Sequence, residues 1–167
     1  MANPASFDIT SGVDLQEVDN AVNQARKEIA QRYDFKGSKS TIDLKKAENI
    51  IEIVSDDTFK MEAVWEILLG RLVRRGVPVK NMKPGDIEQI GGSLVKRKVE
   101  LQQGIPTEAA KDIVKFLKDK KFKKVTAAIQ ADQLRVSSPS KDELQQVMRE
   151  LRGQDFGVEL QFGNYRE

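Results

Sequence analysis

The alternation of hydrophobic and polar residues predicts the same series of strands and helices twice along this chain. Short apolar strands at residues 51–53 and 134–136 lie 83 positions apart, and an amphipathic helix follows each of them directly. Asp57 and Ser140, again 83 positions apart, stand where the N-cap of each helix is expected. A repeat of this length is too long for a solenoid and indicates two copies of one small domain.

Each half of the chain is expected to contain a strand, a helix, two strands, a second helix and a last strand. In the first half the pattern predicts strands near residues 7–9, 42–44 and 51–53, and helices over 15–31 and from 57 to 76. In the second half it predicts strands near 95–101, 125–129, 134–136 and 158–162, and helices over 106–117 and 140–153. We therefore predict an α+β protein, a tandem of two ferredoxin-like (RNP-like) βαββαβ domains whose antiparallel sheets each carry helices on one face.

The least regular segment, residues 77–93, contains the turn signals Pro84-Gly85 and Gly91-Gly92. We interpret it as the end of the first domain followed by a linker, which places the two domains at residues 1–92 and 93–167. The first strand of each half could also be exchanged between the domains, and the pattern leaves both arrangements open.

The composition argues against most kinds of catalysis. The chain has no cysteine and no histidine, which excludes disulfides, thiol nucleophiles and cysteine-type zinc sites and removes the usual general base. No cluster of Asp and Glu suggests a metal site, and partial matches to catalytic motifs lack their companion residues. We predict a protein that is not an enzyme and has no catalytic residue, metal ion or cofactor.

The sequence also favours a location in the cytoplasm. Charged residues make up 32% of the chain, and no apolar run is long enough to span a membrane. The N-terminal residues resemble no secretory signal. We expect no membrane association.

Positive charge is concentrated in the second half. The net charge is −2 over residues 1–90 and +4 over residues 91–167. Alternation places Lys96, Lys98 and Arg135 on the face of the second sheet that is not covered by helices, where they could hold phosphate groups. The alternative is that these side chains only keep an exposed face soluble. Arg97 falls on the apolar side of its strand, which implies either a snorkelling side chain or a bulge.

Two other segments combine basic and aromatic residues. Six lysines lie within residues 115–124, where they could meet phosphate or could simply end a solvated helix. The loop over residues 32–37 combines Arg32 and Lys36, which could contact phosphate, with Tyr33 and Phe35, which could stack on a base. The alternative is that Phe35 enters the core while Arg32 pairs locally with Asp34. The aromatic signature of RNA-recognition modules is absent from the central strands, so any RNA binding would need another surface.

Six separated motifs resemble the YajQ family of small bacterial proteins over essentially the whole chain. They are Ser6-Phe7-Asp8-Ile9, Arg32-Tyr33-Asp34-Phe35-Lys36, Gln103-Gly104-Ile105, Leu134-Arg135-Val136, Asp142-Glu143-Leu144-Gln145, and Leu160-Gln161-Phe162 with Asn164-Tyr165-Arg166. The resemblance implies two ferredoxin-like domains and nucleotide binding. Cyclic di-GMP is the ligand described for members, other nucleotides and nucleic acid have been proposed, and no established catalytic activity comes with the family.

These observations lead to one leading hypothesis and one alternative. The leading hypothesis is a non-enzymatic nucleotide-binding protein, a receptor for cyclic di-GMP or another guanine nucleotide that could also contact a regulatory protein partner. The alternative is an RNA- or tRNA-binding module that uses the basic face of the second sheet. The candidate nucleotide-binding residues are Arg32, Tyr33, Phe35, Lys36, Lys96, Lys98, Arg135, Tyr165 and Arg166.

Overall fold

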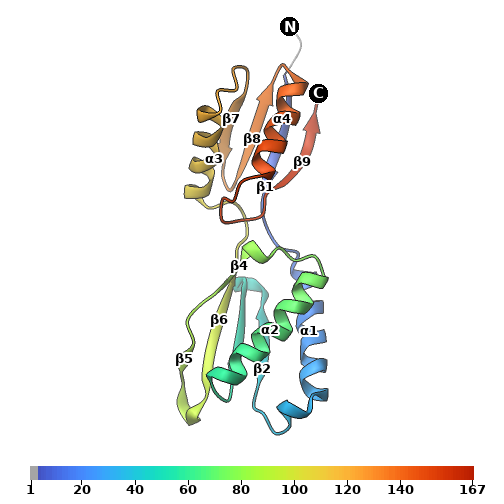
Figure 1. Cartoon of the computed structure of the whole chain (residues 1–167), viewed down its shortest axis with the longest axis vertical. Helices are drawn as coiled ribbons and strands as arrows, with labels where there is room; N and C mark the ends of the chain where they lie inside the picture. Colours follow the sequence, from blue (N-terminus) through green and yellow to red (C-terminus); the bar gives the residue numbers. More distant parts are fainter. Residues whose placement is uncertain (1–3) are drawn as a thin grey trace. The chain divides into compact units, whose positions relative to one another are not determined.

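The computed structural model describes residues 4–167. The chain forms two compact units, and one of them is inserted into the sequence of the other. One unit combines the residues up to Gly12 with Gly104–Glu167, and we call it the split unit. The other, Val13–Gln103, is the inserted unit. Figure 1 shows the N-terminal strand, in blue, lying between the orange and red strands of the C-terminal segment.

The split unit has the complete ferredoxin-like βαββαβ order. Its elements are β1 (Ala5–Thr10), α3 (Thr107–Asp119), β7 (Thr126–Gln130), β8 (Gln133–Ser138), α4 (Lys141–Arg152) and β9 (Gln161–Arg166). The strands lie in the order β7-β8-β1-β9, and every pair is antiparallel. This confirms the α+β fold and the antiparallel sheet predicted from the sequence.

The inserted unit has the same sheet order with its strands permuted in sequence. Its elements are α1 (Leu15–Gln31), β2 (Thr41–Lys45), β3 (Ile50–Ser55), α2 (Thr58–Arg74), β4 (Met82–Pro84), β5 (Glu88–Gln89) and β6 (Val95–Leu101). Short 3-10 helices lie at Tyr33–Phe35, Lys46–Glu48, Val79–Asn81 and Gly91–Ser93. The sheet order is β2-β3-β6-β4, with β5 also paired to β6, so β6 occupies the position that β1 has in the split unit.

This arrangement differs from domain boundaries at residues 1–92 and 93–167. β1 pairs with β8 and β9, and β6 pairs with β3, so the pairing is the exchange of first strands that the sequence left open. Both strands alternate apolar and polar residues, and local alternation does not specify which sheet a strand joins. Residues 77–93, interpreted as the end of the first domain followed by a linker, contribute β4 and β5, which both pair with β6 in the inserted unit. The last strand begins at Gln161, later than expected, and runs to Arg166.

The helix starts follow from capping side chains, as predicted. The carboxylate of Asp57 accepts from the Lys60 amide at 2.7 Å, and the Ser140 hydroxyl accepts from the Glu143 amide at 3.3 Å. Each such bond satisfies a backbone donor that has no partner within the helix.

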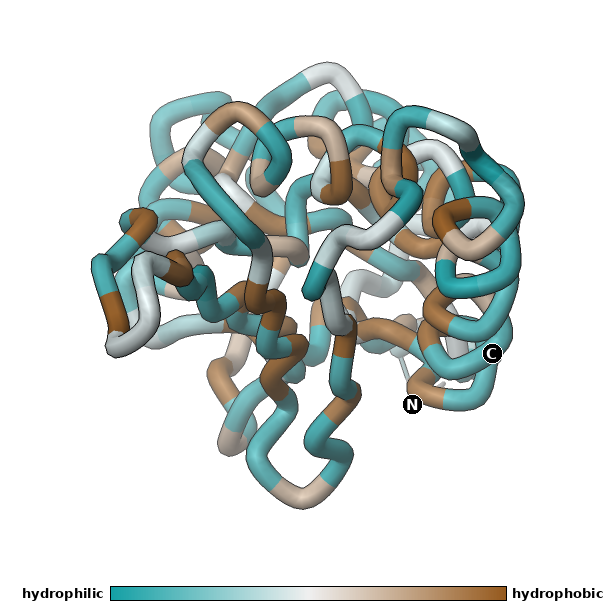
Figure 2. Tube along the Cα trace, turned by 90° about the horizontal axis from the view of Figure 1, so that it is seen from below, coloured by the Kyte–Doolittle hydropathy of each residue, from teal (hydrophilic) through white to brown (hydrophobic). Residues whose placement is uncertain are grey.

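Each unit has its own hydrophobic core, formed by the inward face of its sheet and its helices. In the split unit the core includes Phe7, Ile9, Ile113, Leu134, Val136 and Leu144. In the inserted unit it includes Val22, Ile51, Ile53, Met61, Leu68 and Val99. Hydrophobic and hydrophilic segments alternate along the trace in Figure 2, and none of the helices formed by residues 4–167 is both long and apolar enough to cross a bilayer.

Arg97 lies on the helix-covered face of β6 without any bulge, because the register between β3 and β6 is continuous. Its Nε atom donates to the Gly85 carbonyl at 2.9 Å, and its terminal nitrogen lies 3.3 Å from a Glu62 carboxylate oxygen on α2. The snorkelling alternative is therefore the one that the structure contains.

Candidate functional site

The open face of the sheet in the split unit is built around a buried carboxylate, Asp8. Phe7 and Ile9 are fully buried on the helix-covered side of β1, so alternation turns Asp8 to the opposite face. Asp8 is nevertheless only 3% exposed. A charge removed from water in this way requires charged or hydrogen-bonding partners.

Three side chains from the neighbouring strands supply those partners. The Arg166 guanidinium donates to one Asp8 carboxylate oxygen at 2.8 Å, and the Arg135 Nε atom donates to the other at 3.1 Å. The Asn164 amide donates at 3.0 Å. Arg166 also donates to the Ser6 hydroxyl at 3.0 Å. We call Asp8, Arg135, Asn164 and Arg166 the Asp8 cluster.

Strand register explains how these residues meet. Arg135 is the cross-strand neighbour of Asp8 on β8. On the other side, Asp8 is opposite Gly163 whereas Ser6 is opposite Arg166, so β9 has an extra residue at this point. Asn164 has a φ of 51°, the left-handed conformation that asparagine tolerates well. The irregularity brings both Asn164 and Arg166 to the same carboxylate.

The cluster keeps Asp8 ionised. The hydrogen bond from Arg166, followed by those from Asn164 and Arg135 and by the positive charge of Arg166, lowers the pKa of Asp8 from 3.8 to about 2, although burial opposes this change. At neutral pH the cluster therefore contains one negative and two positive charges.

The two arginines are fixed but remain accessible. Their side chains are 40% and 41% exposed. Within residues 4–167, Arg135 uses only its Nε atom in hydrogen bonds and ion pairs, so both of its terminal nitrogens face no protein acceptor. A guanidinium held by a carboxylate on one side can bind a phosphate or a guanine edge on the other. Tyr165, between Asn164 and Arg166 in the sequence of β9, is 42% exposed.

Lys96 and Lys98 are not part of this face, so the predicted basic surface of Lys96, Lys98 and Arg135 is wrong. Both lysines lie on β6 in the inserted unit, because β6 pairs with β3. Lys96 lies 3.1 Å from a carboxylate oxygen of Glu52, and Lys98 is the cross-strand neighbour of the same residue. Lys45 binds Glu52 as well, at 2.8 Å, and hydrogen bonds from Lys45 and Lys96 lower the pKa of that carboxyl. Lys96 therefore already has a carboxylate partner within the protein.

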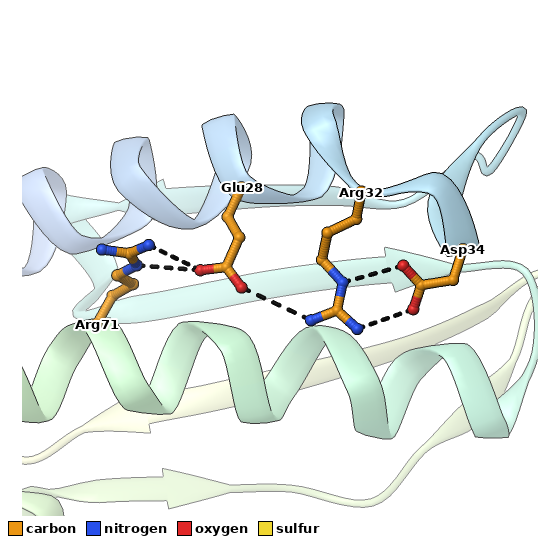
Figure 3. Close-up of polar contacts among 4 residues, drawn as sticks. All are labelled: Glu28, Arg32, Asp34 and Arg71. Carbon is orange, nitrogen blue, oxygen red and sulfur yellow. Dashed lines mark hydrogen bonds and ion pairs between the residues drawn. The ribbon is translucent and has the colours of Figure 1, made fainter.

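The loop after α1 is occupied by local interactions. Figure 3 shows the Nε atom and one terminal nitrogen of Arg32 bonded to the two carboxylate oxygens of Asp34, at 3.0 and 2.8 Å, and Glu28 between Arg32 and Arg71. This pairing lowers the pKa of Asp34 and raises that of Arg32. Phe35 is buried, with the Lys60 ammonium 4.8 Å from its ring centroid. The structure therefore has the local arrangement that the sequence offered as an alternative.

Two residues of the loop remain available to a ligand. Tyr33 is 87% exposed, and Lys36 is exposed beside it. A groove of about 320 Å³ between α1 and α2 is lined by Arg32, Arg71 and Arg74, together with Glu28 and Glu66, so its charges nearly cancel. The loop thus offers an exposed ring, but its arginine already has carboxylate partners.

The sequence placed Arg135, Tyr165 and Arg166 among the candidates, and the structure brings them to one sheet. It missed Asp8 and Asn164, on which the positions of the two arginines depend. A charged residue between two apolar strand residues was the available signal for Asp8. No group of three or more metal-binding side chains gathers in the part of the chain that the structure describes.

Comparison with known proteins adds a family. The family model described as "Nucleotide-binding protein YajQ-like" matches residues 5–166. A nucleotide-binding protein of Elusimicrobium minutum (strain Pei191) is 50% identical over 161 residues, which cover 96% of this chain and 98% of that protein. A nucleotide-binding protein of Magnetococcus marinus (strain ATCC BAA-1437 / JCM 17883 / MC-1) is 51% identical over 162 residues, covering 97% and 99%. The similarity thus extends through both units.

Proposed function

This chain belongs to the YajQ-like family, and from that membership we propose that it is a non-enzymatic nucleotide-binding protein whose site is the Asp8 cluster. The observation that carries the proposal is the pair of half-exposed guanidinium groups that the buried Asp8 carboxylate fixes on the open sheet face. A ligand phosphate meets two arginines whose orientation is already set, so little side-chain entropy is lost on binding.

The chemistry of the cluster favours a guanine nucleotide. Arginine forks onto phosphate oxygens and onto the O6 and N7 atoms of guanine, and both kinds of acceptor occur in cyclic di-GMP. Tyr165, which precedes Arg166 on β9, has an exposed ring and is the aromatic side chain that we propose for base stacking. We propose cyclic di-GMP as the ligand on this basis, with Arg135 and Arg166 at phosphate or guanine and Tyr165 on a base.

The first experiment is calorimetric titration of the nucleotide-free protein with cyclic di-GMP, GTP and a short structured RNA at two salt concentrations. Cyclic di-GMP is expected to bind saturably with a shallow dependence on salt, because it carries only two phosphates. Binding of RNA alone, with affinity that falls steeply as salt rises, would instead support the alternative function of RNA binding. The lysine-rich segment over residues 115–124 is the surface that favours this alternative.

Replacing Arg135 with glutamine is expected to weaken cyclic di-GMP binding by about tenfold or more, because a charge-assisted hydrogen bond is lost. Lys27→Gln removes the same charge from an exposed position in the inserted unit and is the matched control. Equal affinity of the Arg135 variant and the control variant would exclude Arg135 from the site.

The loop is tested separately by the double variant Arg32→Ala with Lys36→Ala. Because Arg32 is held by Asp34 and Glu28, we expect this variant to bind cyclic di-GMP less than about threefold more weakly than the unmodified protein. A loss of affinity for cyclic di-GMP as large as that of the Arg135 variant would place the proposed site at the loop instead.

A further inference from the structure

Besides the Asp8 cluster, the split unit has a second surface open to a binding partner, which is the free edge of its sheet at β7. In the order β7-β8-β1-β9, β7 pairs only with β8 among the strands of residues 4–167. Its sequence, Thr-Ala-Ala-Ile-Gln, contains no charged residue, no proline and no glycine. Natural edge strands are usually protected by such residues. Ile129 is 46% exposed on this strand.

An apolar groove runs between this edge strand and α3. A hollow of about 210 Å³ is lined by Leu117, Phe122, Val125 and Ala127 among others, and a second, of about 280 Å³, is lined by Ile129 and residues of α3. Val114 and Lys118 line both hollows, so the two are adjacent. We call this feature the α3–β7 groove. Figure 1 shows α3 and β7 side by side at this end of the sheet.

The rim of the groove is strongly basic. Lys111, Lys115 and Lys118 line it, against one carboxylate, that of Asp119. Over residues 111–124 the chain has seven lysines and two aspartates, and all seven lysines are exposed. Lys120 is paired with Glu150 at 3.6 Å, on the side of α4.

We propose that the α3–β7 groove binds an extended peptide that carries alternating acidic and apolar residues and adds to the sheet as a strand beside β7. The backbone of the peptide pairs with the unprotected edge, its apolar side chains enter the two hollows, and its carboxylates meet the lysines of α3. A helix and an edge strand that enclose a peptide between them are an established geometry for this mode of recognition. The site is separate from the Asp8 cluster and does not depend on it.

The charge of the groove distinguishes this occupant from the two others that an open edge could attract. Pairing of β7 with β7 of a second copy would bring two lysine-rich segments together, and like charges in an interface are strongly unfavourable. RNA would satisfy the lysines, but it would leave Ile129 and the apolar floor of the groove without apolar partners.

The test uses the full chain and a soluble peptide probe of about eight alternating valine and glutamate residues, capped at both ends, a length that covers the edge strand. Hydrogen exchange measured by NMR is expected to show the amides of β7 at least about tenfold more protected when the peptide is saturating. A peptide with lysine in place of glutamate, and one N-methylated at alternate residues, are expected not to protect β7.

The double variant Lys115→Glu with Lys118→Glu is expected to bind the probe about tenfold or more weakly, because two attractive contacts become repulsive. Lys27→Glu with Lys46→Glu changes the same charge at exposed positions of the inserted unit and should leave binding unchanged. Ile129→Asn is expected to weaken binding of the probe independently of charge, since it removes an exposed apolar side chain without disturbing the buried core.

Three results would overturn the proposal. The first is no protection of β7 by the probe, or equal protection by the N-methylated peptide. The second is protection that rises with protein concentration alone, which would assign the edge to a second copy of the chain. The third is competition in which a single-stranded oligonucleotide of equal charge displaces the probe and protects no β7 amide, which would assign the lysines to nucleic acid.

Discussion

Asp8→Asn is expected to lower the free energy of unfolding of the split unit by about 2–4 kcal/mol at neutral pH. The fall in the pKa of Asp8 from 3.8 to about 2 corresponds alone to about 2 kcal/mol. The variant also leaves Arg135 and Arg166 facing an amide that carries no charge, and removing one partner of a buried ion pair typically costs about 3–5 kcal/mol. The half-exposed arginines recover part of this loss by hydration, which gives the range stated.

The two units allow this effect to be measured with an internal reference. Trp65, the single tryptophan, packs against the core of the inserted unit, so its fluorescence should report an unchanged unfolding midpoint in denaturant. Hydrogen exchange of the β1 and β8 amides reports the stability of the split unit and should show the lower free energy of unfolding. Asp112→Asn, at an exposed position on α3, is the matched control. A loss of less than about 1 kcal/mol would mean that the cluster is not the buried ion pair described here.

The stability of the split unit should depend on pH differently in the unmodified protein and in the Asp8→Asn variant. A carboxyl whose pKa is lower in the folded state stabilises the fold above its unfolded pKa, and this contribution disappears as the pH falls towards the folded value. For Asp8 the window lies between about pH 4 and about pH 2. The unmodified split unit should therefore lose its advantage over the asparagine variant across this window, whereas a constant difference would show that Asp8 does not titrate there.

Local features of the fold were predictable from the sequence, whereas strand pairing was not. The helix starts after Asp57 and Ser140 were predictable because a cap and its helix lie within a few residues. The partners of β1 and β6 were not, since both strands alternate in the same way and either could complete either sheet. The error over Lys96 and Lys98 follows from that ambiguity alone.

The candidate site was predictable only in part for the same reason. Arg135 and Arg166 are recognisable as basic residues near the expected sheet, but the contacts that fix them join Asp8 to residues 127 and 158 positions away. The irregularity at Asn164, which turns Arg166 towards Asp8, has no signature in a strand pattern that assumes strict alternation.

The division into a split and an inserted unit predicts that a chain of residues 13–103 folds alone and that one of residues 93–167 does not. The shorter C-terminal chain lacks β1, so the facing edges of β8 and β9 lose their hydrogen-bond partners. It also lacks Phe7 and Ile9, both fully buried, and the cavity left by one such side chain costs about 2–5 kcal/mol. Together these losses reach the total stability of a small domain, about 5–15 kcal/mol.

In each unit the two chain ends that this separation creates lie close together. In the inserted unit the Gln103 side chain bonds the backbone of Val13 at 2.9 and 3.0 Å, so its two termini are adjacent. In the split unit the Gly104 amide donates to the Ser11 carbonyl at 2.8 Å, so a short Gly-Ser linker can join residues 4–12 directly to 104–167. That joined chain is expected to show the dispersed NMR spectrum of a folded domain, and residues 13–103 to keep the native Trp65 emission. Cooperative folding of residues 93–167 alone would instead restore the domain boundaries expected from the sequence and remove β1, and with it Asp8, from the proposed site.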